Sequence, residues 1–215
     1  MPHNYPLLLE VGDREIVIVG GGEVAVRKAI GLIDAGATRV RVVAPQVHER
    51  MPAQVQRVAQ AYRPEHLRGA SLVFAATDDR KANDAIVRDA RELGILVCRA
   101  DNDDEHAGDF ATPAMIRRGP VLVTVSTSGS PALATTIRDA IEKTLDPRWI
   151  AMAQAMVSLR PRIRAMPSLA PSRRKEIFRT LASDDALNVL ATGDPLALER
   201  WIIGQYPELA ELGST

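Results

Sequence analysis

The 215-residue chain has one cysteine, Cys98, which excludes an intramolecular disulfide framework and any zinc site built from several cysteines. It has no excess charge, since 27 Lys and Arg balance 27 Asp and Glu, so net charge does not point to nucleic acid. No apolar run approaches the roughly 20 residues that span a bilayer, and the first residues lack the basic and apolar regions of a secretory signal. We therefore expect a cytoplasmic protein with no nucleic-acid or membrane partner.

The order of apolar patterns predicts the fold class. Over residues 1–100, short β-branched runs alternate with longer segments of helical periodicity, which is typical of a parallel sheet with crossover helices. The sequence therefore predicts an α/β fold with a Rossmann-type parallel sheet, and residues 54–62 are expected to be a connecting segment. The expected strands are residues 15–19, 39–44, 71–75, 95–100 and 121–126, and the expected helices are residues 24–35, 81–92, which ends before Gly94, and 131–143.

Past Leu145 only helical patterns remain, and we place a domain boundary near Pro147. Breaks are expected at Pro161, Pro167, Pro171 and Pro195. Residues 147–175 hold seven Lys or Arg and no acid, whereas residues 176–215 hold seven acids and two bases. Two interpretations stay open for the basic segment: a solvated helix surface, or a site for a polyanionic small molecule.

The strongest local motif is Gly20-Gly21-Gly22-Glu23-Val24-Ala25, which follows an apolar strand pattern and opens a helical one. This is the G-x-G-x-x-A arrangement of dinucleotide-binding turns. Gly20 permits the tight turn, Gly22 lets the backbone approach a pyrophosphate, and Ala25 allows close helix–strand packing. The alternative is a tight glycine turn that binds no ligand.

The ends of the second and third strands offer further cofactor contacts. An acid that binds the adenosine ribose is expected near the end of the second strand, yet Ala44 and Pro45 stand there. Either a backbone or neutral group holds this ribose, or the site distinguishes less strictly between NAD and its phosphorylated form, NADP. Arg41 alone does not indicate NADP. Thr77 and Asp78 can bind ribose or nicotinamide, while Asp79 is expected to cap the next helix.

An acidic stretch begins at Asp101, directly after the fourth strand. A carboxylate there can accept a proton as hydride leaves a substrate, or take N–H protons during metal insertion. The alternative is a solvated loop, which we prefer for the individual acids between Asp101 and Asp109. A resident metal site built with His106 is disfavoured, and His3, His48 and His66 are dispersed and receive no role. The acids of the stretch are Asp101, Asp103, Asp104, Glu105 and Asp109.

A hydroxyl-rich turn with Ser126, Ser128 and Ser130 lies between the last strand and the helix that begins at Pro131. Hydroxyls at a helix start can bind carboxylate or phosphate, but a plain N-cap does the same. No histidine-supported nucleophile pattern surrounds them, so hydrolase chemistry is not indicated.

Taken in order, these motifs resemble the dehydrogenase–ferrochelatase family of siroheme synthesis. The resemblance is carried by Pro6-Leu7, the glycine motif with Arg27-Lys28, Val43-Ala44-Pro45, Ala75-Ala76-Thr77-Asp78-Asp79, Asp101, Phe110-Ala111-Thr112-Pro113-Ala114 and the segment from Val125 to Pro131. It implies an NAD-binding Rossmann domain (1–112), a segment that forms a homodimer (113–147) and a helical C-terminal domain (148–215).

The resemblance also implies oxidation of precorrin-2 to sirohydrochlorin with NAD as hydride acceptor, and Fe2+ or Co2+ as a metal substrate if insertion occurs. Asp101 matches the aspartate that is essential for dehydrogenation, and Asp103 and Asp104 are its neighbouring alternatives. The implied cofactor residues are Gly20, Gly21, Gly22, Glu23, Val24, Ala44, Pro45, Thr77 and Asp78. The substrate carboxylates would meet Ser126, Ser128, Ser130 and the arginines Arg117, Arg118, Arg160, Arg162, Arg164, Arg173 and Arg174.

Two other functions fit the sequence less well. A Rossmann module that senses NAD without catalysis would not need the basic segment. A chelatase that has lost its dehydrogenase activity would make no use of Gly20 and Gly22, so their presence favours NAD use.

Overall fold

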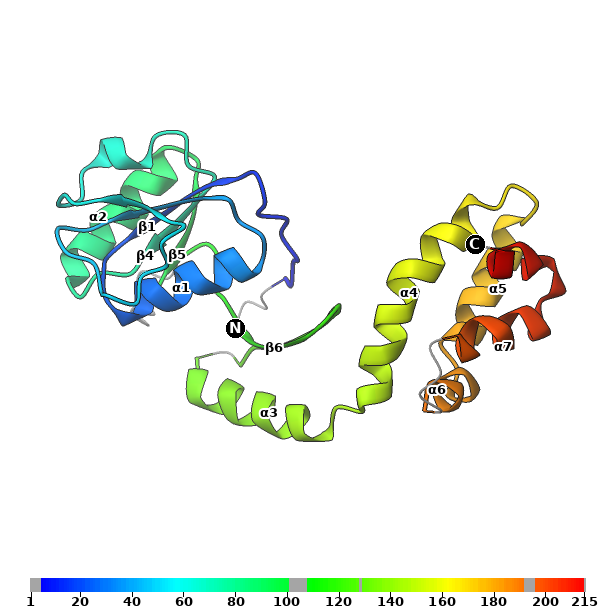
Figure 1. Ribbon diagram of the computed structural model, residues 1–215. Coiled ribbons are helices and arrows are strands. Elements are labelled where there is room, and N and C mark those ends of the chain that lie inside the picture. The colour runs from blue at the N-terminus through cyan, green and yellow to red at the C-terminus, as the bar shows by residue number, and fades with distance from the viewer. Residues whose placement is uncertain (1–4, 101–107, 128, 192–195, 215) are drawn as a thin grey trace. The chain divides into compact units, whose positions relative to one another are not determined.

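A computed structural model describes residues 5–100, 108–127, 129–191 and 196–214 of the chain (Figure 1). The chain divides into two compact units, Met1–Thr112 and Pro113–Thr215. Among the described residues, no helix is both long enough and apolar enough to cross a membrane. Each unit has its own apolar core.

The first unit is a five-stranded sheet in the order β3-β2-β1-β4-β5, with every pair of neighbours parallel. This confirms the predicted α/β fold with a Rossmann-type sheet, because 3-2-1-4-5 is the strand order of dinucleotide-binding folds. The elements are β1 (Glu15–Val19), α1 (Glu23–Asp34), β2 (Arg39–Val43), β3 (Gln56–Val58), the 3-10 helix η1 (Pro64–Leu67), β4 (Leu72–Ala75), α2 (Arg80–Glu92) and β5 (Leu96–Arg99).

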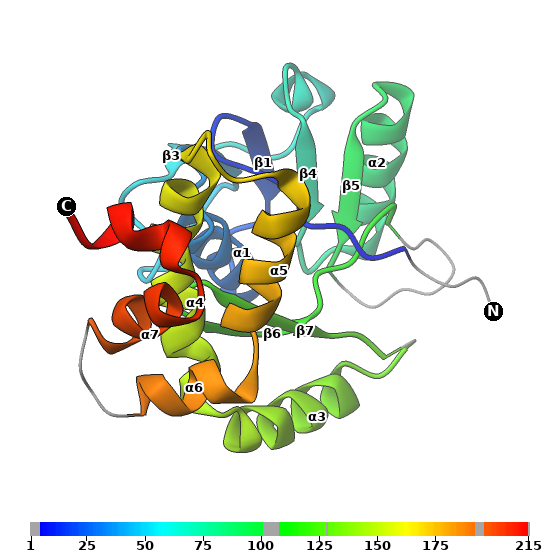
Figure 2. The ribbon, with the colours of Figure 1, turned by 90° about the vertical axis from the view of Figure 1, so that its right-hand side faces the viewer.

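The burial of the central strand β1 explains why its sequence pattern predicted a strand correctly. Ile16 and Ile18 pack with residues of α1 on one face of the sheet, whereas Val17 and Val19 pack with residues of α2 on the other. All four side chains are at most 1% exposed. A strand that is buried on both faces is apolar throughout, as parallel sheets covered by helices require. Figure 2 shows α2 running alongside β5.

The sequence prediction missed one feature of this unit, the strand β3, and was correct for another, the end of α2. The predicted connecting segment 54–62 contains β3, a three-residue edge strand whose Gln56 and Arg57 are exposed. A strand this short and polar gives no period-two pattern, which is why the sequence did not reveal it. Gly94, at φ +68°, follows the end of α2 and confirms the predicted helix stop.

The second unit begins with an antiparallel hairpin of β6 (Ala114–Arg118) and β7 (Val121–Val125), whose turn includes Gly119 at φ +53°. Helices then follow, and those after α3 share an apolar core around Ile163, Ile177, Leu181 and Ile202. They are α3 (Pro131–Thr144), α4 (Pro147–Ala165), α5 (Pro171–Leu181), α6 (Asp184–Leu190), α7 (Ala197–Gln205) and the 3-10 helix η2 (Pro207–Ser214).

The prediction that Pro161 breaks the helix was wrong, because α4 runs through it. Proline removes one helical N–H, which leaves the carbonyl of Val157 without its usual partner. Val157 is 64% exposed, so water can satisfy this carbonyl, while Leu159 and Ile163 remain buried on the opposite face. Pro171 begins α5 and Pro167 follows the end of α4, as predicted; Pro195 lies outside the described residues.

Candidate functional site

The carboxyl ends of β1, β2 and β4 bring most of the predicted cofactor residues to one edge of the sheet. The chain leaves β1 for β2 on one side and reaches β4 on the other, so the strand order reverses between β1 and β4. Ligands of open parallel sheets bind at such a switch point. The residues placed at this edge are Gly20 to Val24 after β1, Ala44 and Pro45 after β2, and Thr77 and Asp78 after β4.

Gly20 is wedged between the neighbouring strands. Its φ is +125°, and a Cβ atom there would overlap the Ala76 carbonyl and lie 3.0 Å from the Thr77 nitrogen. Its own N–H donates to the Val43 carbonyl at 3.0 Å. Only glycine fits this backbone without strain, so the turn after β1 is held tightly against β2 and β4.

Gly22 leaves the start of α1 open. It is the N-cap residue of α1, and among the described residues no side chain caps this helix. A Cβ atom on Gly22 would have nothing within 4 Å, whereas Ala25 one turn later is completely buried. Uncapped N–H groups and the positive end of the helix dipole favour an anion. The geometry fits the pyrophosphate of a dinucleotide.

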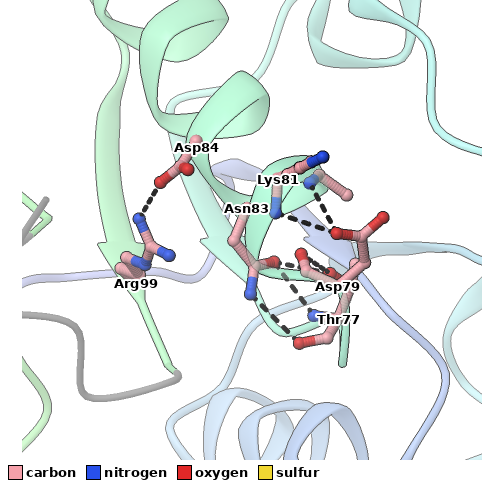
Figure 3. A network of polar contacts seen from close by, with 7 residues as sticks. Thr77, Asp79, Lys81, Asn83, Asp84 and Arg99 are labelled. Atoms are coloured by element: carbon pink, nitrogen blue, oxygen red, sulfur yellow. Dashed lines mark hydrogen bonds and ion pairs between the residues drawn. The ribbon is translucent and has the colours of Figure 1, made fainter.

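The loop after β4 is shaped by Asn83, which the sequence interpretation missed (Figure 3). Asn83 is completely buried, and its Oδ1 accepts hydrogen bonds from the backbone N (3.2 Å) and hydroxyl (2.7 Å) of Thr77. Its Nδ2 donates to the Thr77 carbonyl at 3.0 Å. Asp79 caps α2 through Lys81 N at 2.8 Å, as predicted. Thr77 is therefore anchored by α2, while Asp78 is exposed.

Replacing Asn83 by Ala is expected to lower the free energy of unfolding by about 1–3 kcal/mol, because Thr77 N–H and C=O lose their partners. Urea denaturation measures this change. The Asp79→Ala variant is the comparison, since it removes only the helix cap at a cost of about 1 kcal/mol. An Asn83→Ala variant as stable as the unaltered protein would contradict the anchoring role.

The edge strand β5 contacts the helix α2, which precedes it, and Asp109, which follows it. Arg99, whose side chain is 1% exposed, pairs with Asp84 of α2 (Figure 3). Asp109, the last acid of the acidic stretch, donates from its backbone N to Val97 O at 2.6 Å. Its carboxylate accepts from Val97 N (3.1 Å) and Arg91 Nε (2.9 Å). The chain thus returns to the free edge of β5. The predicted catalytic residue Asp101 lies outside the described residues, as does Ser128.

The motif that ends the first unit packs on α1. Lys28 donates a hydrogen bond from Nζ to the Thr112 hydroxyl and lies 5.8 Å from the centroid of the Phe74 ring. Phe110 meets Phe74 edge to face at 5.5 Å between centroids. Burial lowers the pKa of Lys28, and burial raises the pKa of the neighbouring Cys98 thiol. Lys28 and Phe110 hold residues 110–112 against the sheet domain.

The lowered pKa of Lys28 predicts a pH dependence of stability. The pKa of Lys28 is near 10.5 in the unfolded chain and lower in the folded protein. Below the folded pKa, burial of the charged ammonium group destabilises the protein. This destabilisation disappears above about pH 10.5, where the group is neutral in both states. The free energy of unfolding of the unaltered protein should therefore rise relative to Lys28→Met as pH increases through this window. Urea denaturation at several alkaline pH values measures the difference, and a difference independent of pH contradicts the lowered pKa.

The predicted substrate residues lie in the second unit. Arg117, Arg160 and Arg164 are exposed, and Arg160 also stacks 4.8 Å from the Phe178 centroid. Other members have protein partners: Arg118 with Glu142, Arg162 with Glu199 (2.7 Å) and Leu212 O, Arg173 with Glu176 and Glu208, Arg174 with Met166 O, and Ser130 with Leu133 N. Ser126 is exposed. Their roles stay predictions.

Within the described ranges, no group of three or more His, Cys, Asp or Glu residues is arranged to hold a metal ion.

A five-stranded sheet in Rossmann order with an open glycine turn at its switch point defines a dinucleotide-binding protein. The family model described as "Putative NAD(P)-binding" matches residues 7–114, and the chain belongs to this family.

Two curated relatives carry names of the predicted family. Siroheme synthase 1 of Aeromonas salmonicida is 35% identical over 195 residues, which cover 88% of this chain and 41% of that protein. The siroheme synthase of Gluconacetobacter diazotrophicus is 31% identical over 232 residues, or 96% of this chain and 48% of that protein. The chain thus spans less than half the length of these relatives.

Among solved structures, "SirC, precorrin-2 dehydrogenase" is similar with a TM-score of 0.75 and 23% sequence identity. The similarity covers 95% of this chain and all of that one. It shows that the two proteins share the fold of both units.

Proposed function

We propose that this protein oxidises precorrin-2 to sirohydrochlorin with NAD in siroheme or cobalamin biosynthesis, in the cytoplasm. The observation that carries the proposal is the uncapped start of α1 behind Gly22, at the switch point of the sheet. The name of the SirC structure, a precorrin-2 dehydrogenase, supports this substrate, and the names of the siroheme synthases support the pathway.

The residues at the sheet edge have distinct tasks in this proposal. Backbone N–H groups of Glu23 and Val24 would hold the pyrophosphate, because no side chain of the described part competes for them. Small Ala44 and Pro45 would receive the adenosine ribose, and Thr77 and Asp78 the groups near the nicotinamide. When bound, NAD supplies the acceptor for one hydride.

Oxidation of precorrin-2 to sirohydrochlorin removes one hydride and one proton. Asp101 would take the proton as general base, since it follows the carboxyl end of β5 by two residues in the sequence. The carboxylates of the substrate would be bound by exposed arginines of the second unit, of which Arg117, Arg160 and Arg164 are the best placed to meet a ligand from solvent.

A homodimer through residues 113–147 is part of the proposal. The hairpin of β6 and β7 and the helix α3 bury only Ile116 and Ala134, while Met115, Leu133 and Ile137 are 36–50% exposed. A two-stranded hairpin is marginally stable alone. We therefore propose that the same segment of a second copy covers these apolar side chains.

An anaerobic absorption spectrum of precorrin-2 with the purified protein tests the function. We expect conversion to the sirohydrochlorin spectrum only when NAD+ is present. Adding Fe2+ or Co2+ afterwards tests metal insertion, for which a change faster than the protein-free rate is required. Absence of any NAD-dependent change would overturn the dehydrogenase and leave a dinucleotide-sensing module.

A further inference from the structure

The segment that follows β2 packs closely against the glycine turn after β1. A Cβ atom on Gly21 would overlap the Gln46 carbonyl oxygen and lie 3.0 Å from Ala44 Cβ. His48 N donates to the Gly21 carbonyl at 2.8 Å. These contacts fix residues 44–50 beside the start of α1.

Three charged or titratable side chains meet at this crossing. Glu23, the first residue of α1, accepts a hydrogen bond from Arg50 Nη2 at its Oε1. The same oxygen lies 3.4 Å from His48 Nε2, and Arg50 N donates to His48 Nδ1 at 3.1 Å. One carboxylate therefore holds both basic side chains. Glu23 and Arg50 are more than half exposed, at 64% and 60%, so a ligand from solvent can reach them.

Proteins with this fold distinguish NAD from NADP just after β2, where an acid binds the ribose 2′-hydroxyl or an arginine binds the 2′-phosphate. The residues after β2 here are Ala44 and Pro45, so no acid stands at the usual place. Glu23 of α1 brings a carboxylate to the segment after β2, where it contacts His48 and Arg50.

We propose that Glu23 sets the preference of this protein for NAD over NADP. The proposal rests on the function given above, in which NAD is the cofactor. The ion pair of the Glu23 carboxylate with Arg50 occupies the guanidinium that would otherwise bind a 2′-phosphate bidentately.

The charge of Glu23 is also compatible with a pyrophosphate at the start of α1. Its Oε1 is held by Arg50 and His48 of the segment after β2, and Arg50 balances its negative charge. The N–H groups at the start of the helix remain uncapped by any side chain of the described residues.

Isothermal titration with NAD+ and with NADP+ tests the proposal without any tetrapyrrole. The variants are Glu23→Gln, Arg50→Gln, the double variant, and Asp34→Asn, which removes one carboxylate at the far end of the same helix. In Glu23→Gln the ratio of the Kd for NADP+ to the Kd for NAD+ should fall about tenfold, because Arg50 becomes available to the phosphate. The double variant should lose this gain, and Asp34→Asn should keep the original ratio.

The outcomes separate this proposal from the proposed function. Tight binding of NAD+ by the unaltered protein with the same ratio in Glu23→Gln, or an equal fall in Asp34→Asn, overturns the role of Glu23 and leaves the function standing. Failure of the unaltered protein to bind either dinucleotide overturns both.

Discussion

Replacing Asp101 by Asn is expected to lower the turnover of precorrin-2 by about 10²–10⁴-fold, the usual contribution of a general base. The amide keeps the size of the side chain but cannot accept the proton. Binding of NAD+ should be unchanged, because the groups proposed to hold the dinucleotide lie after β1, β2 and β4. Single-turnover absorption under anaerobic conditions measures the rate, and titration calorimetry measures the binding.

The neighbouring acids provide matched controls. Asp103→Asn and Asp104→Asn remove the same charge two and three positions later, and each should retain turnover within about threefold because neither carboxylate takes the substrate proton. A large loss in Asp103→Asn or Asp104→Asn with normal turnover in Asp101→Asn would move the catalytic role to that neighbour. Normal turnover in all three would remove these acids from the mechanism.

Replacing Gly20 by Ala is expected to lower the free energy of unfolding by about 3 kcal/mol and to weaken NAD+ binding at least about tenfold. The reason is local: φ is +125°, and the added methyl group would overlap the Ala76 carbonyl. The turn must shift away from β4, and the start of α1 shifts with it. Urea denaturation and titration calorimetry measure the two effects.

Gly22→Ala separates binding from folding. Its methyl group would meet no protein atom within 4 Å, and its φ of −84° suits alanine, so stability should stay within about 1 kcal/mol of the unaltered protein. The methyl group would stand where a pyrophosphate must approach the backbone, so binding should still weaken about tenfold. Undiminished NAD+ binding in Gly22→Ala would place the dinucleotide elsewhere.

Features with a strong local cause could be predicted from the sequence. The strand β1 is apolar on both faces, and the glycines that follow it leave few backbone alternatives, so strand, turn and helix were all predicted close to their observed bounds. Asp79 was likewise recognised as a cap, because capping depends on residues only two or three positions away.

Features that depend on how side chains pack in three dimensions were not predicted. Asn83 becomes important only because α2 carries it to the loop after β4, and an asparagine within a helix gives no such signal. His48 received no role, since its contact with Glu23 joins residues 25 positions apart. Pro161 was predicted to break the helix because proline normally ends helices. In α4, burial of Leu159 and Ile163 outweighs the one missing hydrogen bond.

The most direct test of the central claim is the stoichiometry of NADH formed to precorrin-2 oxidised, measured anaerobically with the unaltered protein. We expect one NADH for each sirohydrochlorin, because a single hydride leaves the substrate for the dinucleotide. Sirohydrochlorin formed without NADH, or no reaction when both substrates are present, would contradict it.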